Sequence, residues 1–209
     1  MPFHYERNIF MDNITGRFAS AAVFANDIEN YAHAQIRMIL DNQVSINSKG
    51  CIMPDCHPGK VGPIGLTMTV TDKIIPQLMG VDIGCGMLMA KVEGRFEYPK
   101  LDRVISENVP SGFNIRKMPH NKALFEVISE LRCLRAVNGD KALKSLGTLG
   151  GGNHFIEVDK GEDGYYLIIH SGSRHLGYDV ADYYTEAARR RLANMGKDVP
   201  YEMSYVEGR

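Results

Sequence analysis

The sequence has almost no net charge and no long apolar run. Its 24 basic and 25 acidic residues give a formal charge of −1 over 209 residues. Charge alone therefore predicts neither a nucleic-acid nor a membrane partner, although a local basic groove fits within a neutral total. No run reaches the roughly 18 apolar residues of a membrane-spanning helix, and the first 13 residues lack the apolar core of a signal peptide. These absences favour a cytoplasmic protein.

Cysteine is also scarce, with four residues at positions 51, 56, 85 and 133. Without a secretion signal, four cysteines indicate thiols or metal ligands rather than a disulfide framework. A Cys51–Cys56 disulfide remains an alternative. The hydrophobic fraction of 44% and the charged fraction of 23% are ordinary for a folded globular protein. The length suits one domain spanning residues 1–209, or one large domain with an appendage.

Three segments have the apolar periodicity of helices. In the first, Asn26 and Glu29 have capping-box spacing and apolar residues follow to Leu40. The second carries a stripe from Leu124 to Leu134 and is expected to end at Asn138-Gly139. The third has Arg189–Arg191 late in the helix, which suit a solvated helix end better than a nucleic-acid patch. Its predicted apolar side consists of Val180, Tyr183, Tyr184, Ala187, Ala188 and Leu192.

Short β-like runs at 64–70, 87–92, 154–158 and 165–171 lie between these helices, and glycine-rich loops connect several of them. The pattern predicts an α+β fold with its chemistry in the loops. Four loops combine glycine with potential ligands: "MPDCHPGKVGPIG" (53–65), "GVDIGCGM" (80–87), "LGTLGGGNHFIEV" (146–158) and "HSGSRHLG" (170–177). The candidate ligands are Asp55 and His57, Asp82 and Cys85, Asn153 and His154, and His170 and His175. One such residue alone is more often structural, but four loops together favour a shared site.

Strand alternation refines the third loop. If residues 153–158 are extended, His154 lies on one face, and Asn153 and Glu157 lie on the other. The preceding glycines either let backbone amides approach an anion or form a flexible hairpin connection. In the fourth loop, His170 lies at the end of a strand, where a ligand is expected.

A set of one Asp, one Cys and two His offers oxygen, sulfur and nitrogen donors. Such a set suits zinc, manganese, iron or cobalt better than calcium or magnesium, which prefer oxygen ligands. A cysteine thiolate can bridge two ions, and two-metal sites stabilise the attacking and leaving oxygens of phosphoryl chemistry. Spacing alone does not choose among these metals.

The four motifs, in this order from "MPDCHPG" to "HSGSRHLG", resemble the RtcB family of RNA-splicing ligases. The resemblance implies mixed sheets with flanking helices and an active site in glycine-rich loops at strand ends. It also implies an enzyme that uses GTP and two Mn²⁺ ions to join RNA 2′,3′-cyclic phosphate or 3′-phosphate ends to 5′-hydroxyl ends, as in tRNA splicing and RNA repair.

The resemblance also implies roles for individual residues. The motifs match Asp82, Cys85, His154 and His170 to metal ligands, with Cys85 as the catalytic bridging thiolate. They match Asn153 and Glu157 to guanine-nucleotide contacts, and Arg174 to an arginine that holds an RNA phosphate in catalysis. His57 is expected at most to orient a ligand, Asp55 has no assigned role, and Lys141 and Lys144 are either phosphate contacts or solvated surface lysines.

Family members are about twice as long, and their C-terminal part supplies a further metal histidine and the histidine that accepts GMP. We therefore expect the chain to correspond to the N-terminal portion of such a ligase: a truncated product or half of a two-chain enzyme. Two rival functions stay open. One is an inert metal- and RNA-binding module, and the other is a metal-dependent phosphoesterase.

Overall fold

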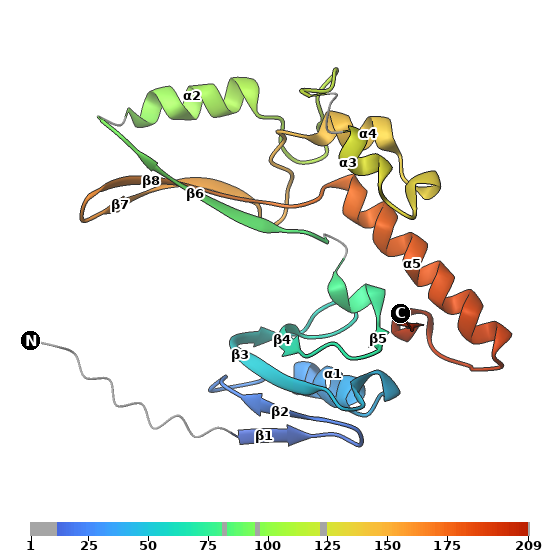
Figure 1. Cartoon of the computed structure of the whole chain (residues 1–209). Coiled ribbons are helices and arrows are strands. Elements are labelled where there is room, and N and C mark those ends of the chain that lie inside the picture. Colours follow the sequence, from blue (N-terminus) through green and yellow to red (C-terminus); the bar gives the residue numbers. More distant parts are fainter. Residues whose placement is uncertain (1–11, 81–82, 95–96, 122–124, 209) are drawn as a thin grey trace, which may run out of the picture. The chain divides into compact units, whose positions relative to one another are not determined.

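The structure is a computed structural model of the chain and describes residues 12–80, 83–94, 97–121 and 125–208 (Figure 1). The fold is α+β, as predicted, with helices, a mixed sheet and an antiparallel sheet. The chain divides into two compact units, one made of residues 1–78 and 185–209 and the other of residues 79–184. Among the described residues, no helix combines the length and apolarity needed to cross a membrane.

The first unit contains a four-stranded sheet in the order β1-β2-β3-β4. Its strands are β1 (Asp12–Thr15), β2 (Ser20–Val23), β3 (Lys49–His57) and β4 (Ile64–Met68). The sheet is mixed because β2 and β3 are parallel while the other two pairs are antiparallel. A separate two-stranded sheet pairs β5 (Lys73–Ile74) with β9 (Val206–Glu207).

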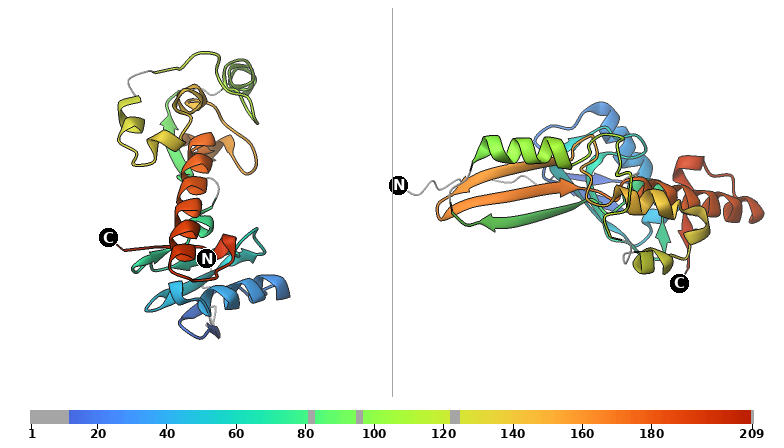
Figure 2. Two further views of the ribbon diagram at one scale, coloured as in Figure 1. Left: turned by 90° about the vertical axis from the view of Figure 1, so that its right-hand side faces the viewer. Right: turned by 90° about the horizontal axis from the view of Figure 1, so that it is seen from above.

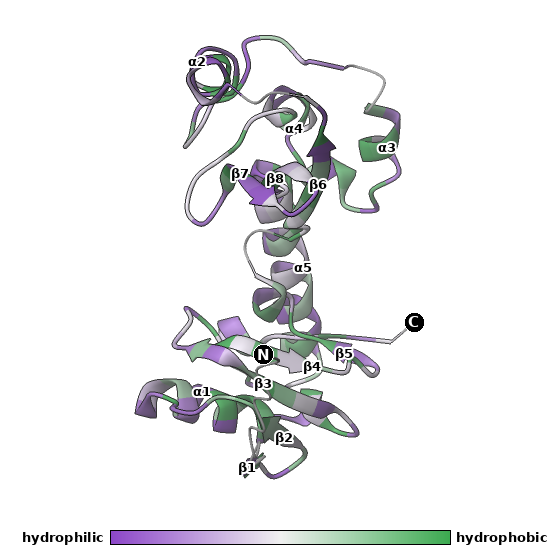
Figure 3. Ribbon diagram, turned by 90° about the vertical axis from the view of Figure 1, so that its left-hand side faces the viewer, coloured by the Kyte–Doolittle hydropathy of each residue, from purple (hydrophilic) through white to green (hydrophobic). Residues whose placement is uncertain are grey.

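Helix α1 (Asn30–Leu40) packs into the core of this unit. Its apolar stripe is confirmed, since Ile36, Ile39 and Leu40 are fully buried, and Figure 3 shows hydrophobic segments on α1 and on the neighbouring β2 and β3. The predicted capping box is wrong. The helix begins after Glu29, whose side chain makes no cap hydrogen bond, so Asn26 lies too far from the first turn.

The second unit is built on an antiparallel sheet in the order β6-β8-β7. Its strands, β6 (Gly86–Val92), β7 (Phe155–Gly161) and β8 (Gly164–Ser171), confirm three of the predicted runs. The register pairs His170 with Met87 on one side and with Phe155 on the other. Helix α2 (Tyr98–Asn108), which was not predicted, runs alongside this sheet (Figures 1 and 2). None of its residues is buried, although Tyr98, Leu101 and Ile105 recur at helical spacing.

The prediction of one helix that ends at Asn138 is wrong. The chain instead forms α3 (Phe125–Ser129), η4 (Leu134–Ala136) and α4 (Gly139–Ser145). Asn138 begins α4, because its side-chain oxygen accepts a hydrogen bond from the Lys141 amide at 3.0 Å. An Asn-Gly pair fits a helix start as well as a helix end, and here the cap decides. Leu124 lies outside the described residues.

The third predicted helix is confirmed as α5 (His175–Asn194). The buried face of α5 differs in part from the predicted apolar side. It consists of Ala181, Thr185, Ala188 and Leu192, of which only Ala188 and Leu192 were predicted. Tyr183 is 40% exposed and Ala187 is also exposed. Three further single-turn helices are η1 (Gln43–Ser45), η2 (Pro76–Met79) and η5 (Tyr201–Met203).

Candidate metal centre

Three predicted ligands converge at one end of the β6-β8-β7 sheet. Cys85 lies directly before β6, and His154 lies directly before β7. His170 is the second-to-last residue of β8. Because β8 runs antiparallel to both neighbours, its C-terminal end meets the beginnings of β6 and β7. One ligand atom from each of the three side chains lies within 4.8 Å of the others. The Cys85 Sγ is 3.7 Å from His154 Nε2, and the two imidazole centroids are 5.4 Å apart.

The two imidazoles are oriented by backbone carbonyls. His154 Nδ1 lies 3.0 Å from the Leu149 oxygen, and His170 Nδ1 lies 3.1 Å from the Asn153 oxygen. A carbonyl oxygen only accepts, so each contact assigns the ring proton to Nδ1. The lone pair of a neutral imidazole is then on Nε2, which is the arrangement of metal-ligating histidines whose other nitrogen is held by a carbonyl.

The prediction from strand alternation needs a correction at His154. Strand β7 begins at Phe155, and residues 152–153 form a turn, so alternation does not govern the direction of the His154 side chain. The turn brings His154 toward His170. Residues paired across an antiparallel sheet share a face, and the register therefore places Phe155 and Glu157 on the face of His170.

Gly150 shows why the loop before His154 is rich in glycine. Its φ of +91° lies in the left-handed region, where a side chain is strained. A Cβ on Gly150 would lie 1.8 Å from Arg174 Nη1 and 2.6 Å from His154 Nδ1. The loop thus packs directly against a candidate ligand and a candidate phosphate-binding residue. This favours a close-packed loop over the flexible hairpin connection.

The loop before Cys85 is fixed in a similar way by helix α5. A Cβ on Gly177 would lie 1.9 Å from Ser173 Oγ and 3.0 Å from both the nitrogen and the oxygen of Ile83. Gly84, between Ile83 and Cys85, has a φ of +88°. The missing side chain of Gly177 therefore lets the Cys85 loop lie against the first turn of α5.

Arg174 is held by two neighbouring loops. Its Nη2 donates to the Gly112 oxygen at 2.6 Å, and its Nε donates to Thr148 Oγ1 at 3.3 Å. The residue itself adopts a φ of +58°, which is unusual for a residue other than glycine. These contacts fix the direction of the guanidinium beside the glycine loop.

A cavity of about 600 Å³ opens beside His154. Its walls come from the 112–115 segment, α4, the glycine loop and the first turn of α5. Lys141 and Arg174 contribute cations, whereas Phe113, His175 and Tyr178 contribute rings. Sequence reasoning missed Phe113, and no local pattern marks it. Lys144 pairs with Asp140 at 2.6 Å rather than lining the cavity.

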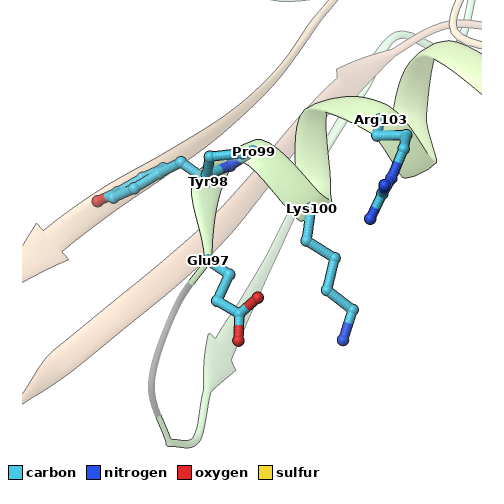
Figure 4. Close-up of a pocket in the computed structure, with 5 residues that line it drawn as sticks. All are labelled: Glu97, Tyr98, Pro99, Lys100 and Arg103. Atoms are coloured by element: carbon cyan, nitrogen blue, oxygen red, sulfur yellow. The ribbon is translucent and has the colours of Figure 1, made fainter.

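A second hollow of about 450 Å³ lies at the start of α2. Figure 4 shows Glu97, Lys100 and Arg103 extending to one side of the helix, while Tyr98 extends to another. Tyr98 packs edge-on against Tyr165 at a centroid distance of 6.4 Å. No residue of this hollow belongs to the metal cluster.

The comparison with protein families gives a decisive match. The family model described as tRNA-splicing ligase RtcB matches residues 35–136 and 129–206. The chain belongs to the RtcB family. It is 31% identical over 171 residues to RNA-splicing ligase RtcB of Escherichia coli K12, covering 71% of this chain and 42% of that protein. It is 30% identical over 196 residues to tRNA-splicing ligase RtcB of Methanococcus maripaludis, covering 66% of this chain and 41% of that protein.

A third RtcB relative, the tRNA-splicing ligase RtcB of Thermococcus kodakarensis, is 27% identical over 204 residues, covering 72% of this chain and 42% of that protein. The chain spans about two fifths of the length of the curated RtcB relatives it matches. Each of these relatives is named as an RNA-splicing or tRNA-splicing ligase.

The other residues singled out from the sequence lie in different parts of the chain. Asn153, in the turn before β7, and Glu157, within β7, are both exposed, and their contacts with a nucleotide stay a prediction. Asp82 lies outside the described residues. Asp55 and His57 lie on β3 of the first unit, where His57 Nδ1 is 2.7 Å from the Asp55 oxygen. Cys51 and Cys56 are thiols, not a disulfide.

Proposed function

We propose that the chain takes part in a GTP- and manganese-dependent RNA ligase. The enzyme would join RNA 2′,3′-cyclic phosphate or 3′-phosphate ends to 5′-hydroxyl ends in tRNA splicing or RNA repair. The observation that carries the proposal is the convergence of Cys85, His154 and His170 within 4.8 Å, in a chain of the RtcB family. Because this reaction acts on cellular RNA and the proposed site uses a reduced thiolate, we place it in the cytoplasm.

The donor set fits a transition-metal ion. One sulfur and two imidazole nitrogens suit manganese, zinc, iron or cobalt and disfavour calcium and magnesium, and manganese is the family expectation. When bound, the metal would neutralise phosphate charge and align the attacking and leaving oxygens. Two ions need more donors than Cys85, His154 and His170 provide. We propose Asp82 and a second polypeptide as sources of the remainder.

The chain's own residues have distinct tasks in this proposal. The Leu149 and Asn153 carbonyls hold the imidazole protons on Nδ1, so that both rings present Nε2. Arg174, fixed by Gly112 and Thr148, directs its guanidinium toward an RNA phosphate. Asn153 and the Glu157 carboxylate contact the guanine nucleotide, and a carboxylate selects guanine by accepting hydrogen bonds from its N–H groups.

An RNA-joining assay tests this function. Purified chain is incubated with Mn²⁺, GTP labelled at the α-phosphate, and two RNAs that carry a 3′-phosphate end and a 5′-hydroxyl end. With the second polypeptide added, we expect transfer of labelled GMP and formation of a joined RNA, both lost in His154→Ala. Release of phosphate without joining would support a phosphoesterase instead. Metal and RNA binding with no transfer of GMP would support an inert module.

The nucleotide assignment has its own test. If Glu157 recognises guanine, titration shows tighter binding of GTP than of ATP, and Glu157→Gln removes the difference. Glu162→Gln, an exposed change near the tip of the β7–β8 hairpin, serves as the control. Equal binding of ATP and GTP by the unaltered chain would contradict the role of Glu157.

A further inference from the structure

Phe113 is the most exposed large apolar side chain of the described residues. Its relative exposure is 105%, so the ring has no packing partner that would explain its position. Exposed apolar residues are common singly. Phe113 differs because it belongs to the wall of the 600 Å³ cavity beside the candidate metal ligand His154.

The segment that carries Phe113 is firmly attached to the glycine loop. The Gly112 amide donates to the Gly150 oxygen at 2.7 Å, and the Leu149 amide donates to the Pro110 oxygen at 2.9 Å. Ser111 and Gly150 form a parallel bridge, and Arg174 donates to the oxygen of Gly112. Phe113 is therefore placed by the same loop that positions His154, and it follows directly the residue that Arg174 contacts.

The rest of the cavity has the character of a nucleotide site. His175 and Tyr178 form an edge-to-face pair with centroids 6.2 Å apart. Lys141 and Arg174 provide positive charge, and among the residues that the structure describes no Asp or Glu lines the cavity. Aromatic rings next to cations are the features that bind single-stranded nucleic acid, in which bases stack and phosphates are neutralised. A volume of about 600 Å³ is in the range of small-molecule sites.

The position of the cavity favours an RNA end over GTP. Its lining includes His154 but neither Asn153 nor Glu157, the residues proposed to contact the guanine nucleotide. A nucleotide in this cavity therefore approaches the metal cluster from the side of Arg174. An RNA 3′ end can place its phosphate near Arg174 and His154 while its base reaches the aromatic wall.

We infer that Phe113 is a stacking residue for the terminal base of the RNA 3′ end, and that His175 and Tyr178 complete the base subsite. This inference rests on the proposed function for the identity of the ligand. Because every base has a π-face, stacking tolerates all four bases. The subsite should thus hold the RNA end without selecting its sequence.

The test compares two short RNAs that both carry a 3′-phosphate. One has 2-aminopurine as its terminal base, and the other is abasic at that nucleotide. With the 209-residue chain, we expect the base-bearing RNA to bind more tightly by about five- to 150-fold, the usual range for one stacked base, and its fluorescence to be quenched on binding. Phe113→Ala should remove most of both effects, and Phe113→Tyr should retain them.

Because Phe113 is fully exposed, Phe113→Ala should leave the thermal midpoint unchanged, which separates lost stacking from lost folding. Equal binding of the two RNAs by the unaltered chain, or no binding of either, would overturn the inference. An equal loss of affinity for both RNAs in Phe113→Ala would also overturn it.

The ligase proposal is judged separately, by the formation of joined RNA. Base-dependent binding without joining would contradict only the ligase, and joining with unchanged RNA affinity in Phe113→Ala would contradict only the stacking subsite.

Discussion

At the scale of single residues, the candidate site depends on positions where a side chain is absent as much as on its ligands. Gly150 and Gly152 are close in sequence and both have positive φ, at +91° and +75°. Only Gly150 faces other atoms, because a Cβ on Gly152 would meet nothing within 4 Å. An alanine at Gly152 should therefore cause backbone strain alone, whereas an alanine at Gly150 should also crowd the site.

We predict that Gly150→Ala is more harmful than Gly152→Ala. Left-handed strain should lower the free energy of unfolding of both variants by about 1–2 kcal/mol. Gly150→Ala should cost more, because its Cβ would displace Arg174 and His154, and it should also weaken metal binding. Urea unfolding and metal titration of both variants check this. Equal destabilisation with intact metal affinity would show that the loop does not position His154.

Arg174 gives a second prediction at this scale. A lysine has one ammonium group and cannot donate to Gly112 and Thr148 while also contacting a phosphate in two places. Arg174→Lys should weaken binding of a 3′-phosphorylated RNA by roughly ten- to 100-fold, as expected for loss of a charged hydrogen bond. In the enzyme completed by the second polypeptide, it should spare GMP transfer. Arg103→Lys on α2 is the matched control. Loss of bound manganese together with RNA binding would assign Arg174 a structural role instead.

At the scale of elements, helix α5 supports the Cys85 loop without contributing a ligand. Gly177 lies in the first turn of α5, where alanine is intrinsically better by about 1 kcal/mol. We predict the opposite result for Gly177→Ala: a lower thermal midpoint and weaker metal binding, because its Cβ would collide with Ser173 and Ile83.

Gly86→Ala is the control for that experiment. Gly86 is adjacent to Cys85, yet a Cβ there would meet nothing within 4 Å. Its thermal midpoint should stay close to that of the unaltered chain. If Gly177→Ala proves as stable as Gly86→Ala, α5 does not set the position of the loop.

The β7–β8 hairpin has a titratable group whose behaviour can be predicted. The Lys91 ammonium, 2.6 Å away, lowers the pKa of Asp163, and the Tyr166 hydroxyl lowers it further. Because the folded pKa lies below the unfolded one, this contribution to stability is present above the unfolded pKa and is lost as pH falls through the folded pKa. Lys91→Met should raise the Asp163 pKa in a carboxyl NMR titration. Lys160→Met, the control, should leave the Asp163 pKa unchanged. An unchanged Asp163 pKa in Lys91→Met would refute the ion pair.

Sequence patterns predicted the elements whose periodicity comes from burial. The α1 stripe and the strands of the β6-β8-β7 sheet were found in this way. The patterns failed where a single cap or a long-range contact decides. Asn138 was assigned to a helix end because its capping bond to Lys141 is invisible in the sequence. Helix α2 was also missed, although its few apolar residues have helical spacing. His154 and His170 were found from their motifs, but Phe113 owes its place to contacts of the preceding Ser111 and Gly112 with Gly150, which is distant in sequence.

At the scale of the whole molecule, the described candidate ligands all belong to one compact unit, residues 79–184. Cys85, His154 and His170 are spread over 86 residues of chain, so a metal that binds all three favours the folded unit over the unfolded chain. At a concentration one hundred times its dissociation constant, a ligand of the folded state stabilises it by about 2.7 kcal/mol. Metal binding and the stability of this unit should therefore rise together.

The central claim is that Cys85, as a thiolate, is the shared ligand of a manganese site. The most direct test is calorimetric titration of Mn²⁺ with elemental analysis, in buffers of different ionisation enthalpy, on the unaltered chain, Cys85→Ala and Cys51→Ala. A thiolate ligand must lose its proton. We therefore predict that binding releases protons and weakens as pH falls, that Cys51→Ala binds like the unaltered chain, and that Cys85→Ala retains no manganese. Full manganese occupancy in Cys85→Ala would contradict the account.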